Sequence, residues 1–143
     1  MLNRRSVWKM LKQEGVLDSK DAKVQKLVQY VRDNPQKCWA DLIPVYREKF
    51  YDTYDTILPV LVKMKDPTVN SVLIKNLDPK KKNELGTLTA IADTSDPGND
   101  PVAFKRLAKI GNTTLTKKLQ TRQLPDSVKV ILTKLPGVTT NGG

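Results

Sequence analysis

Two helical patterns joined by a turn make up the segment ILPVLVKMKDPTVN, residues 57–70. Apolar residues recur at helical spacing on both sides of Asp66-Pro67. A short polar side chain before a helix accepts a hydrogen bond from an unpaired backbone N–H, and proline fits the next position because its missing N–H would have no partner there. The segment therefore predicts one helix over about Thr53–Lys65 and a second over Pro67–Leu77.

The same opening device recurs along the chain at near-even intervals. Asn34, Asp66 and Asp100 each stand directly before a proline, and each proline precedes an apolar run with helical spacing. A repeat of about 33 residues is typical of stacked helix pairs, in which each pair buries its remaining apolar face against the next. The four prolines that set the interval, with gaps of 32, 34 and 24 residues, are Pro35, Pro67, Pro101 and Pro125.

We therefore predict an all-α protein built from stacked antiparallel helix pairs, with a compact helical bundle as the alternative. No strand pattern competes, because the β-branched segment Val128–Leu132 follows helical spacing. Helix starts are also predicted at Asp18-Ser19 and Asp78-Pro79, and a loop at Thr94–Asp100. Pro44 is expected to kink or divide the helix that contains it. The four predicted pairs are Ser19–Phe50, Thr53–Leu77, Pro79–Ile110 and Thr113–Leu135.

The central segment resembles a HEAT repeat. In that family the first helix often carries a proline, an aspartate marks the turn, and the second helix begins with a Val-Arg-like pair. Pro59, Asp66 and Val69 match this pattern. Asn70 stands where arginine is usual, and Phe104–Gly111 resembles the end of a second helix, with its glycine suited to end that helix in a left-handed conformation. The resemblance implies a HEAT-like α-solenoid.

The length of 143 residues suits one domain with a single core. We expect a short basic helix at residues 1–15, one all-helical domain of about four helix pairs at residues 16–135, and a flexible tail at residues 136–143. The start lacks the apolar stretch of a secretory signal but is loosely similar to a transit peptide. The longest apolar run, Ile57–Val62, is too short to span a bilayer. We expect an intracellular, cytoplasmic protein, with import into an organelle left open.

Residue types that support common enzyme chemistry are scarce. The chain has no histidine and one cysteine, so it lacks the commonest general base, the commonest neutral metal ligand and a cysteine-rich zinc site. Its seven glycines form no phosphate-binding loop. Asp93, Asp96 and Asp100 lie close in sequence, but they lack the spacing of a calcium loop and the third is needed as a helix cap. We expect no enzyme activity, no metal and no cofactor.

Positive charge gathers toward the C-terminus of this chain, whose net charge is +10. Residues 101–143 hold eight basic residues and one acidic residue, Asp126. If equivalent helix faces lie side by side in a stack, these charges merge into a stripe that attracts an anionic partner. Lys80–Lys82 form a second run, predicted to lie in the first turn of a helix, for which plain solvent exposure is the simpler explanation. The candidate anion-binding residues are Lys80, Lys81, Lys82, Lys105, Arg106, Lys109, Lys117, Lys118, Arg122, Lys129 and Lys134.

These observations predict a non-enzymatic helical-repeat scaffold or adaptor for protein–protein interaction, as a subunit of a larger assembly with an acidic protein partner. The alternative is a nucleic-acid-binding module that uses the same basic residues on phosphates. Lysine outnumbers arginine among the residues after position 100, and Phe104 is the only aromatic residue there, which favours loose contact over base reading. A third interpretation, binding to a membrane surface, rests only on the basic helix around Trp8.

Overall fold

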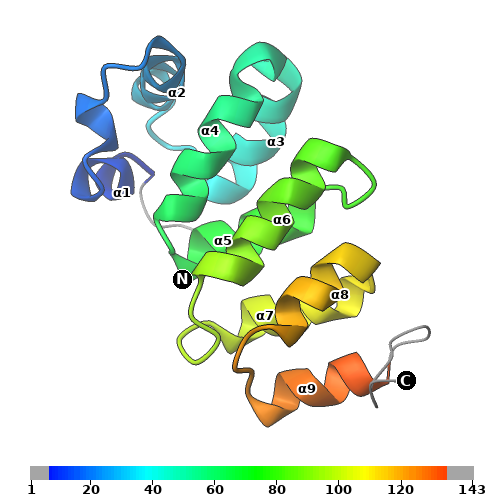
Figure 1. Cartoon of the computed structure of the whole chain (residues 1–143). Helices are drawn as coiled ribbons and strands as arrows, with labels where there is room; N and C mark the ends of the chain where they lie inside the picture. The colour runs from blue at the N-terminus through cyan, green and yellow to red at the C-terminus, as the bar shows by residue number, and fades with distance from the viewer. Residues whose placement is uncertain (1–6, 135–143) are drawn as a thin grey trace. The chain divides into compact units, whose positions relative to one another are not determined.

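The computed structural model describes residues 7–134, and all regular structure in that range is helical (Figure 1). These residues form nine α-helices and one short 3-10 helix, and no strand occurs among them. The prediction of an all-α protein is therefore confirmed. Leu135, the expected tail at residues 136–143, and the basic residues Arg4 and Arg5 lie outside the described range.

The chain forms two compact units, Met1–Val72 and Leu73–Gly143, and the boundary falls inside helix α5 (Pro67–Asn76). Fully buried apolar side chains occur in both units, such as Leu27 and Ile57 in the first and Leu88 and Phe104 in the second. That residues 16–135 act as one domain stays a prediction.

The first unit is built around helix α4, which packs against α2 and α3. Helix α1 contacts α2 and the 3-10 helix η2, so the basic N-terminal helix is part of this unit. Val7 and Leu11 of α1 are buried, and the buried indole N–H of Trp39 donates to the sulfur of Met10 at 3.0 Å. The elements are α1 (Val7–Gln13), η2 (Val16–Asp18), α2 (Ala22–Asp33), α3 (Trp39–Lys49), α4 (Tyr51–Lys63) and the first residues of α5.

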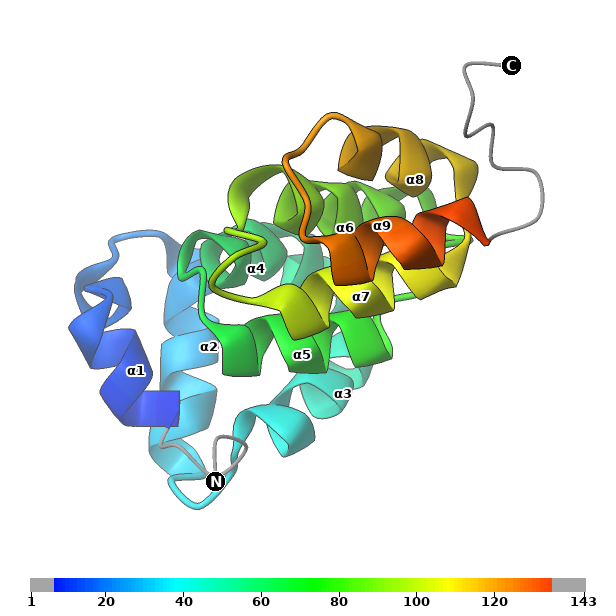
Figure 2. The same cartoon turned by 90° about the horizontal axis from the view of Figure 1, so that it is seen from below.

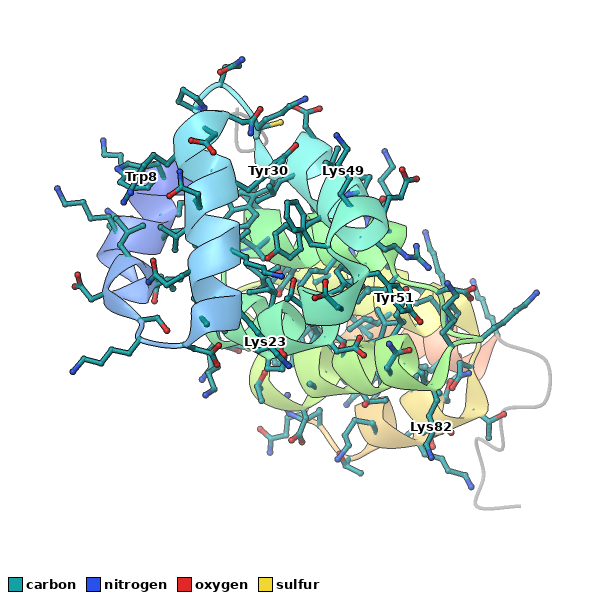
Figure 3. The ribbon with its side chains drawn as sticks, turned by 90° about the horizontal axis from the view of Figure 1, so that it is seen from above. Trp8, Lys23, Tyr30, Lys49, Tyr51 and Lys82 are labelled. Carbon is teal, nitrogen blue, oxygen red and sulfur yellow. The ribbon has the colours of Figure 1, made fainter. Side chains whose placement is uncertain are left out.

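Three aromatic rings join α2 to the end of α3. Tyr30 meets Tyr46 and Phe50 edge to face, with ring centroids 6.5 and 5.4 Å apart, and Tyr46 stacks on Phe50 at 4.5 Å. Burial raises the pKa of Tyr46, and a hydrogen bond from the Thr53 hydroxyl, 3.2 Å away, acts in the opposite direction. Burial disfavours the charged phenolate, so the Tyr46 side chain stays neutral over a wide pH range and packs as a core residue. Tyr30 is half-buried at the edge of this cluster (Figure 3).

In the second unit, each helix packs against the helix two places further along the chain. Helix α6 contacts α8, α7 contacts α9, and α7 also touches both α6 and α8 (Figure 2). Leu88, Phe104 and Leu115 are completely buried in this core. These contacts are consistent with stacked helix pairs. The elements are the last residues of α5, then α6 (Lys82–Thr94), α7 (Pro101–Ile110), α8 (Thr113–Gln120) and α9 (Asp126–Thr133).

Two of the predicted helix openings are confirmed. The side chain of Asp66 accepts hydrogen bonds from the backbone N–H groups of Thr68, at 2.8 Å, and Val69, at 3.2 Å. Asp100 accepts one from the N–H of Ala103 at 3.2 Å, with Pro101 in the first turn of α7. The end of α7 is also as predicted, because Gly111 has a left-handed backbone with φ of 71°.

The opening predicted at Pro35 is wrong. Asn34 instead ends α2, with its N–H on the carbonyl of Val31, and the chain turns over the next residues before α3 begins at Trp39. Cys38 is the N-cap residue of α3, and the Asp41 carboxylate reaches back to accept from its N–H and its thiol, at 3.5 and 3.2 Å. An Asn-Pro pair suits a turn as well as a helix start, so the pair alone does not decide between them.

Two more predicted starts are displaced by three or four residues. Asp18 lies in the 3-10 helix, and Asp21 caps α2 by accepting from the N–H of Lys23 at 2.8 Å. Asp78 caps a turn rather than α6, because its side chain accepts from the N–H of Lys80 at 2.9 Å and the helix starts only at Lys82. Before α6 the aspartate side chain stabilises a short turn, while at α2 a second aspartate three residues further on is the cap.

Prolines lie inside two helices without ending them. Pro44 is in α3 and Pro59 is in α4, and each helix continues on both sides of its proline. Of the two outcomes expected at Pro44, a kink or a division, the division does not occur. Since an internal proline removes one backbone hydrogen bond and crowds the carbonyl four residues earlier, each helix carries a local cost that packing of its buried face must offset.

Replacing the cap of α7 should destabilise the protein. We expect Asp100→Ala to lower the free energy of unfolding by about 1 kcal/mol, because the N–H of Ala103 loses its acceptor. Urea denaturation followed by circular dichroism measures this loss. Asp100→Asn keeps an acceptor oxygen and should stay close to the wild type. If the two variants are equally destabilised, the cap is not the source of the effect.

Removing the proline from α4 should stabilise the protein. Pro59 is exposed, so Pro59→Ala loses little packing while it restores a backbone hydrogen bond to the carbonyl of Asp55. We expect the free energy of unfolding to rise by up to about 3 kcal/mol in the same denaturation experiment. Pro125→Ala, at the N-cap of α9, is the matched control and should change stability by less than about 1 kcal/mol. A loss of stability in Pro59→Ala would contradict this account.

Candidate anion-binding surface

All eleven predicted anion-binding residues lie in the second unit, but on different elements. One group of basic residues lies on α7 and α9, and the other lies on or beside α6 and α8. Lys80 and Lys81 precede α6, Lys82 begins α6, Lys105, Arg106 and Lys109 lie in α7, Lys117 and Lys118 in α8, Arg122 after α8, Lys129 in α9, and Lys134 at the C-cap of α9.

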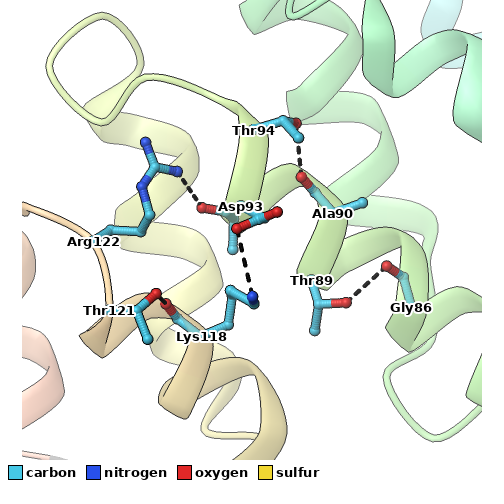
Figure 4. A network of polar contacts seen from close by, with 9 residues as sticks. Gly86, Thr89, Ala90, Asp93, Thr94, Lys118, Thr121 and Arg122 are labelled. Carbon is cyan, nitrogen blue, oxygen red and sulfur yellow. Dashed lines mark hydrogen bonds and ion pairs between the residues drawn. The ribbon is translucent and has the colours of Figure 1, made fainter.

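Arg122 has a structural role. Its guanidinium donates to the backbone carbonyl of Ala92, 2.6 Å away near the C-terminus of α6 (Figure 4). It also lies 5.8 Å from the centroid of the buried Phe104 ring. A cation at a helix C-terminus is favourable, because the last carbonyls lack intrahelical partners. This side chain thus connects the loop after α8 to both α6 and α7, and a part of its charge is satisfied inside the protein.

Two lysines of the set also face carboxylates of their own chain. Lys118 lies 3.5 Å from Asp93 across α8 and α6, with side chains that are 39 % and 56 % exposed (Figure 4). Such a surface pair contributes about 0–1 kcal/mol, so it lowers the local positive potential more than it stabilises the fold. Lys81 lies 3.9 Å from Glu84, whose side chain is only 4 % exposed.

The sequence predicts that Lys80–Lys82 lie together in the first turn of a helix. The structure does not place them there. Only Lys82 belongs to α6, while Lys81 is its N-cap with an extended backbone. Glu84 occupies the first turn instead, and its carboxylate accepts from the N–H of Asp78 at 2.9 Å. A carboxylate at a helix start already complements the dipole, which leaves less reason for an external anion to bind there.

The remaining basic residues gather on α7 and α9, which pack against each other. We define the α7/α9 face as Val102, Lys105, Arg106, Lys109, Lys129, Val130 and Lys134. All of these side chains are exposed except Lys105, which is half-buried. Within α7 and α9, Asp126 in the first turn of α9 is the one acidic residue. With the caps counted, these elements carry five cations and two carboxylates, Asp126 and the N-cap Asp100.

Helical periodicity directs this face outward. In α7, Ala103, Phe104 and Leu107 are buried, while Val102, Arg106 and Lys109 follow at i, i+4 and i+7 on the opposite side. In α9, Val128 and Leu132 are buried and Val130 is 47 % exposed between them in sequence. The two exposed valines are not among the residues predicted from sequence, although the helical pattern puts both on the polar side of their helices.

The carboxylates of the acidic loop have local roles in the backbone. Among residues 7–134 no group of three potential ligands comes close enough to hold a metal ion. Asp96 accepts from the N–H of Gly98 at 2.9 Å, and Asp100 caps α7, so two of these carboxylates stabilise the backbone locally.

Helix α1 uses its apolar side within the protein. Val7, Met10 and Leu11 are buried, and the Arg32 guanidinium lies 5.5 Å from the centroid of the Trp8 ring. The apolar residues that a membrane-surface helix would insert are therefore already packed against the first unit. No helix of the described part of the chain has the length and apolar character needed to cross a bilayer.

No protein-family model, no curated protein and no solved structure matches this chain. The helical fold and the placement of charge on it are thus the observations that bear on function. They define the class as an all-helical protein with a basic surface on its C-terminal unit.

Removing Arg122 should destabilise the fold. We expect Arg122→Ala to lower the free energy of unfolding by about 1–3 kcal/mol, because the carbonyl of Ala92 loses a charged donor. Thermal or urea denaturation measures the change. Lys117→Ala, an exposed lysine on α8, is the matched control and should stay within about 0.5 kcal/mol of the wild type. Equal stability of the two variants would show that Arg122 is free for another role.

Proposed function

We propose that this protein is a non-enzymatic helical scaffold or adaptor that binds an acidic surface of a partner protein through its α7/α9 face. The observation that carries the proposal is the charge on α7 and α9, where, with the caps counted, five basic residues stand against two acidic residues, Asp126 and the N-cap Asp100. Side chains of one sign on adjoining helices raise the local potential, which speeds encounter with an oppositely charged partner.

The HEAT-like architecture belongs to the same proposal. Contacts between α6 and α8 and between α7 and α9 are of the kind that a stack of helix pairs makes, and the matches at Pro59, Asp66 and Val69 support it. Stacked pairs present extended surfaces, on which several partners can be held at fixed positions. We therefore propose a subunit of a larger assembly.

Nucleic acid is the second candidate partner. The same five cations can contact phosphates, and lysines suit such contacts because they act as point charges without fixed geometry. Phe104 is the one aromatic residue of the second unit and is completely buried, so no ring there is available to stack on an unpaired base. A duplex, read through its backbone alone, is the form of nucleic acid that this surface would accept.

Cross-linking in the native source tests the first proposal. We expect the tagged full chain to co-purify with a protein whose acidic residues cross-link to Lys109, Lys129 or Lys134 with a reagent that joins amines to carboxylates. Lys109→Glu combined with Lys134→Glu should reduce the amount of recovered partner by at least about tenfold, because each reversal adds repulsion. Lys23→Glu, an exposed lysine of the first unit, is the control and should leave recovery unchanged (Figure 3).

A contrary result would separate the two candidates. If nuclease treatment abolishes recovery of every partner, and purified protein binds duplex with an affinity that falls steeply with salt, the second candidate replaces the first. Cross-links confined to lysines of the first unit would place the partner elsewhere and overturn the assignment to the α7/α9 face.

A further inference from the structure

The helices of the second unit run back and forth between two edges. Helices α6 and α8 end at the same edge, since Arg122 donates to the carbonyl of Ala92 and Lys118 lies 3.5 Å from Asp93. Figure 1 shows the α6–α7 loop and the α8–α9 link along this edge, and the α5–α6 turn, the α7–α8 turn and the end of α9 along the opposite one. We call the first the loop edge (residues 93–100 and 121–126) and the second the turn edge (residues 75–82, 109–113 and 133–134).

Acidic residues of the second unit gather at the loop edge. Of the six acidic residues in positions 73–134, four lie there, and the one basic residue of that edge, Arg122, donates to a backbone carbonyl. The other two acids, Asp78 and Glu84, are half-buried and buried, and each accepts a hydrogen bond from a backbone N–H before α6. The acids of the loop edge are Asp93, Asp96, Asp100 and Asp126.

The turn edge has the opposite sign. It holds six lysines, all of them exposed, from three successive places along the edge. Asp78, which stabilises the turn before α6, is the one acidic residue in the ranges that define this edge. The chain thus brings together lysines that are far apart in sequence and separates them from the carboxylates. These lysines are Lys75, Lys80, Lys81, Lys82, Lys109 and Lys134.

From this arrangement we infer that the turn edge binds an extended acidic segment of the partner protein, with carboxylates on the lysines of all three places. The inference rests on the proposed function and specifies the form of the partner and the part of the unit that it contacts. Because the loop edge has the same sign of charge as an acidic segment, the potential of the unit directs that segment to one edge only.

The spacing along the turn edge suits an extended chain. Helix α6 packs against α8, and α7 packs against α9. Axes of packed helices lie about 8–10 Å apart, so the row from the α5–α6 turn past the α7–α8 turn to the end of α9 is roughly 20 Å long. An extended chain advances about 3.3 Å per residue, so a segment of about six residues reaches along the row.

The side chains of the turn edge suit carboxylates that lie at variable positions. All of its basic residues are lysines, whose ammonium groups act as point charges on flexible stems. No aromatic residue lies in the ranges that define this edge, so an unpaired base would find no ring there to stack on. Lys81 already lies 3.9 Å from Glu84, which makes the other five lysines the expected contacts.

Binding of an acidic peptide to the full chain tests this inference. The probe is a fluorescent peptide of about eight glutamates, long enough to reach along the turn edge. A peptide of equal length that alternates glutamate with lysine is the reference, because it has the same reach without net charge. Fluorescence anisotropy at about 0.1 M salt, where charges act over about 10 Å, should show the glutamate peptide binding at least about tenfold more tightly.

Variants with the same loss of charge locate the contact. Lys80→Gln combined with Lys134→Gln removes a lysine from each end of the turn edge and should weaken the glutamate peptide about fivefold. Lys117→Gln combined with Lys129→Gln removes the same charge from within α8 and α9 and is the matched control, with an expected change of no more than about twofold. All four lysines are exposed, so the melting temperature should change little in either variant.

The other outcomes separate failure of the inference from failure of the proposed function. If the two variants weaken the peptide equally, the turn edge is not the site, while binding through the α7/α9 face stands. If the glutamate peptide binds no better than the reference, but the native partner still cross-links to Lys109 or Lys134, the extended segment is ruled out and the proposed function stands. If a short DNA duplex binds more tightly than the peptide, and Lys80→Gln with Lys134→Gln weakens it, both are overturned in favour of nucleic acid.

Discussion

Burial of one apolar stripe per helix, against the helix two places along the chain, is the interaction on which the rest of the second unit depends. Leu88 and Phe104 are completely buried in α6 and α7, and Leu115 and Val128 in the helices that cover them. A helix covered along one stripe leaves its other side in water, where charged side chains cost little. The packing thus determines both the stability of the unit and the location of its basic face.

The cations of the second unit divide into two groups by their surroundings. Arg122 and Lys118 face groups of α6, a backbone carbonyl and a carboxylate, so their charge is partly used within the unit. The lysines of α7 and α9 extend from helices that carry a single acid. A count of basic residues would treat these groups alike. Because their surroundings differ, we expect the basic residues of α7 and α9 to bind anions, and Arg122 and Lys118 to interact mainly within the unit.

The helices and several of their ends were predictable from sequence because local chemistry decides them. Asp66 and Asp100 cap helices as their neighbours imply, and Gly111 ends one. The failures at Pro35 and Asp78 share a cause, since Asn and Asp before proline stabilise turns as readily as helix starts. For the candidate site, the sequence predicted which basic residues are present, but not which of them are paired with groups of the protein itself. The partner of Arg122 is thirty residues away, a separation that only tertiary packing brings together.

The junction between α7 and α8 limits how this chain can vary in length. Gly111 ends one helix and Asn112, whose side chain accepts from the N–H of Leu115 at 3.1 Å, begins the next, so two adjacent residues reverse the chain. An inserted residue there would separate the two caps and rotate α8 relative to its buried face. The connection between α6 and α7 is longer and exposes Gly98 and Asn99 at its tip. Evolutionary insertions, and tags added in the laboratory, are therefore best accommodated at that tip.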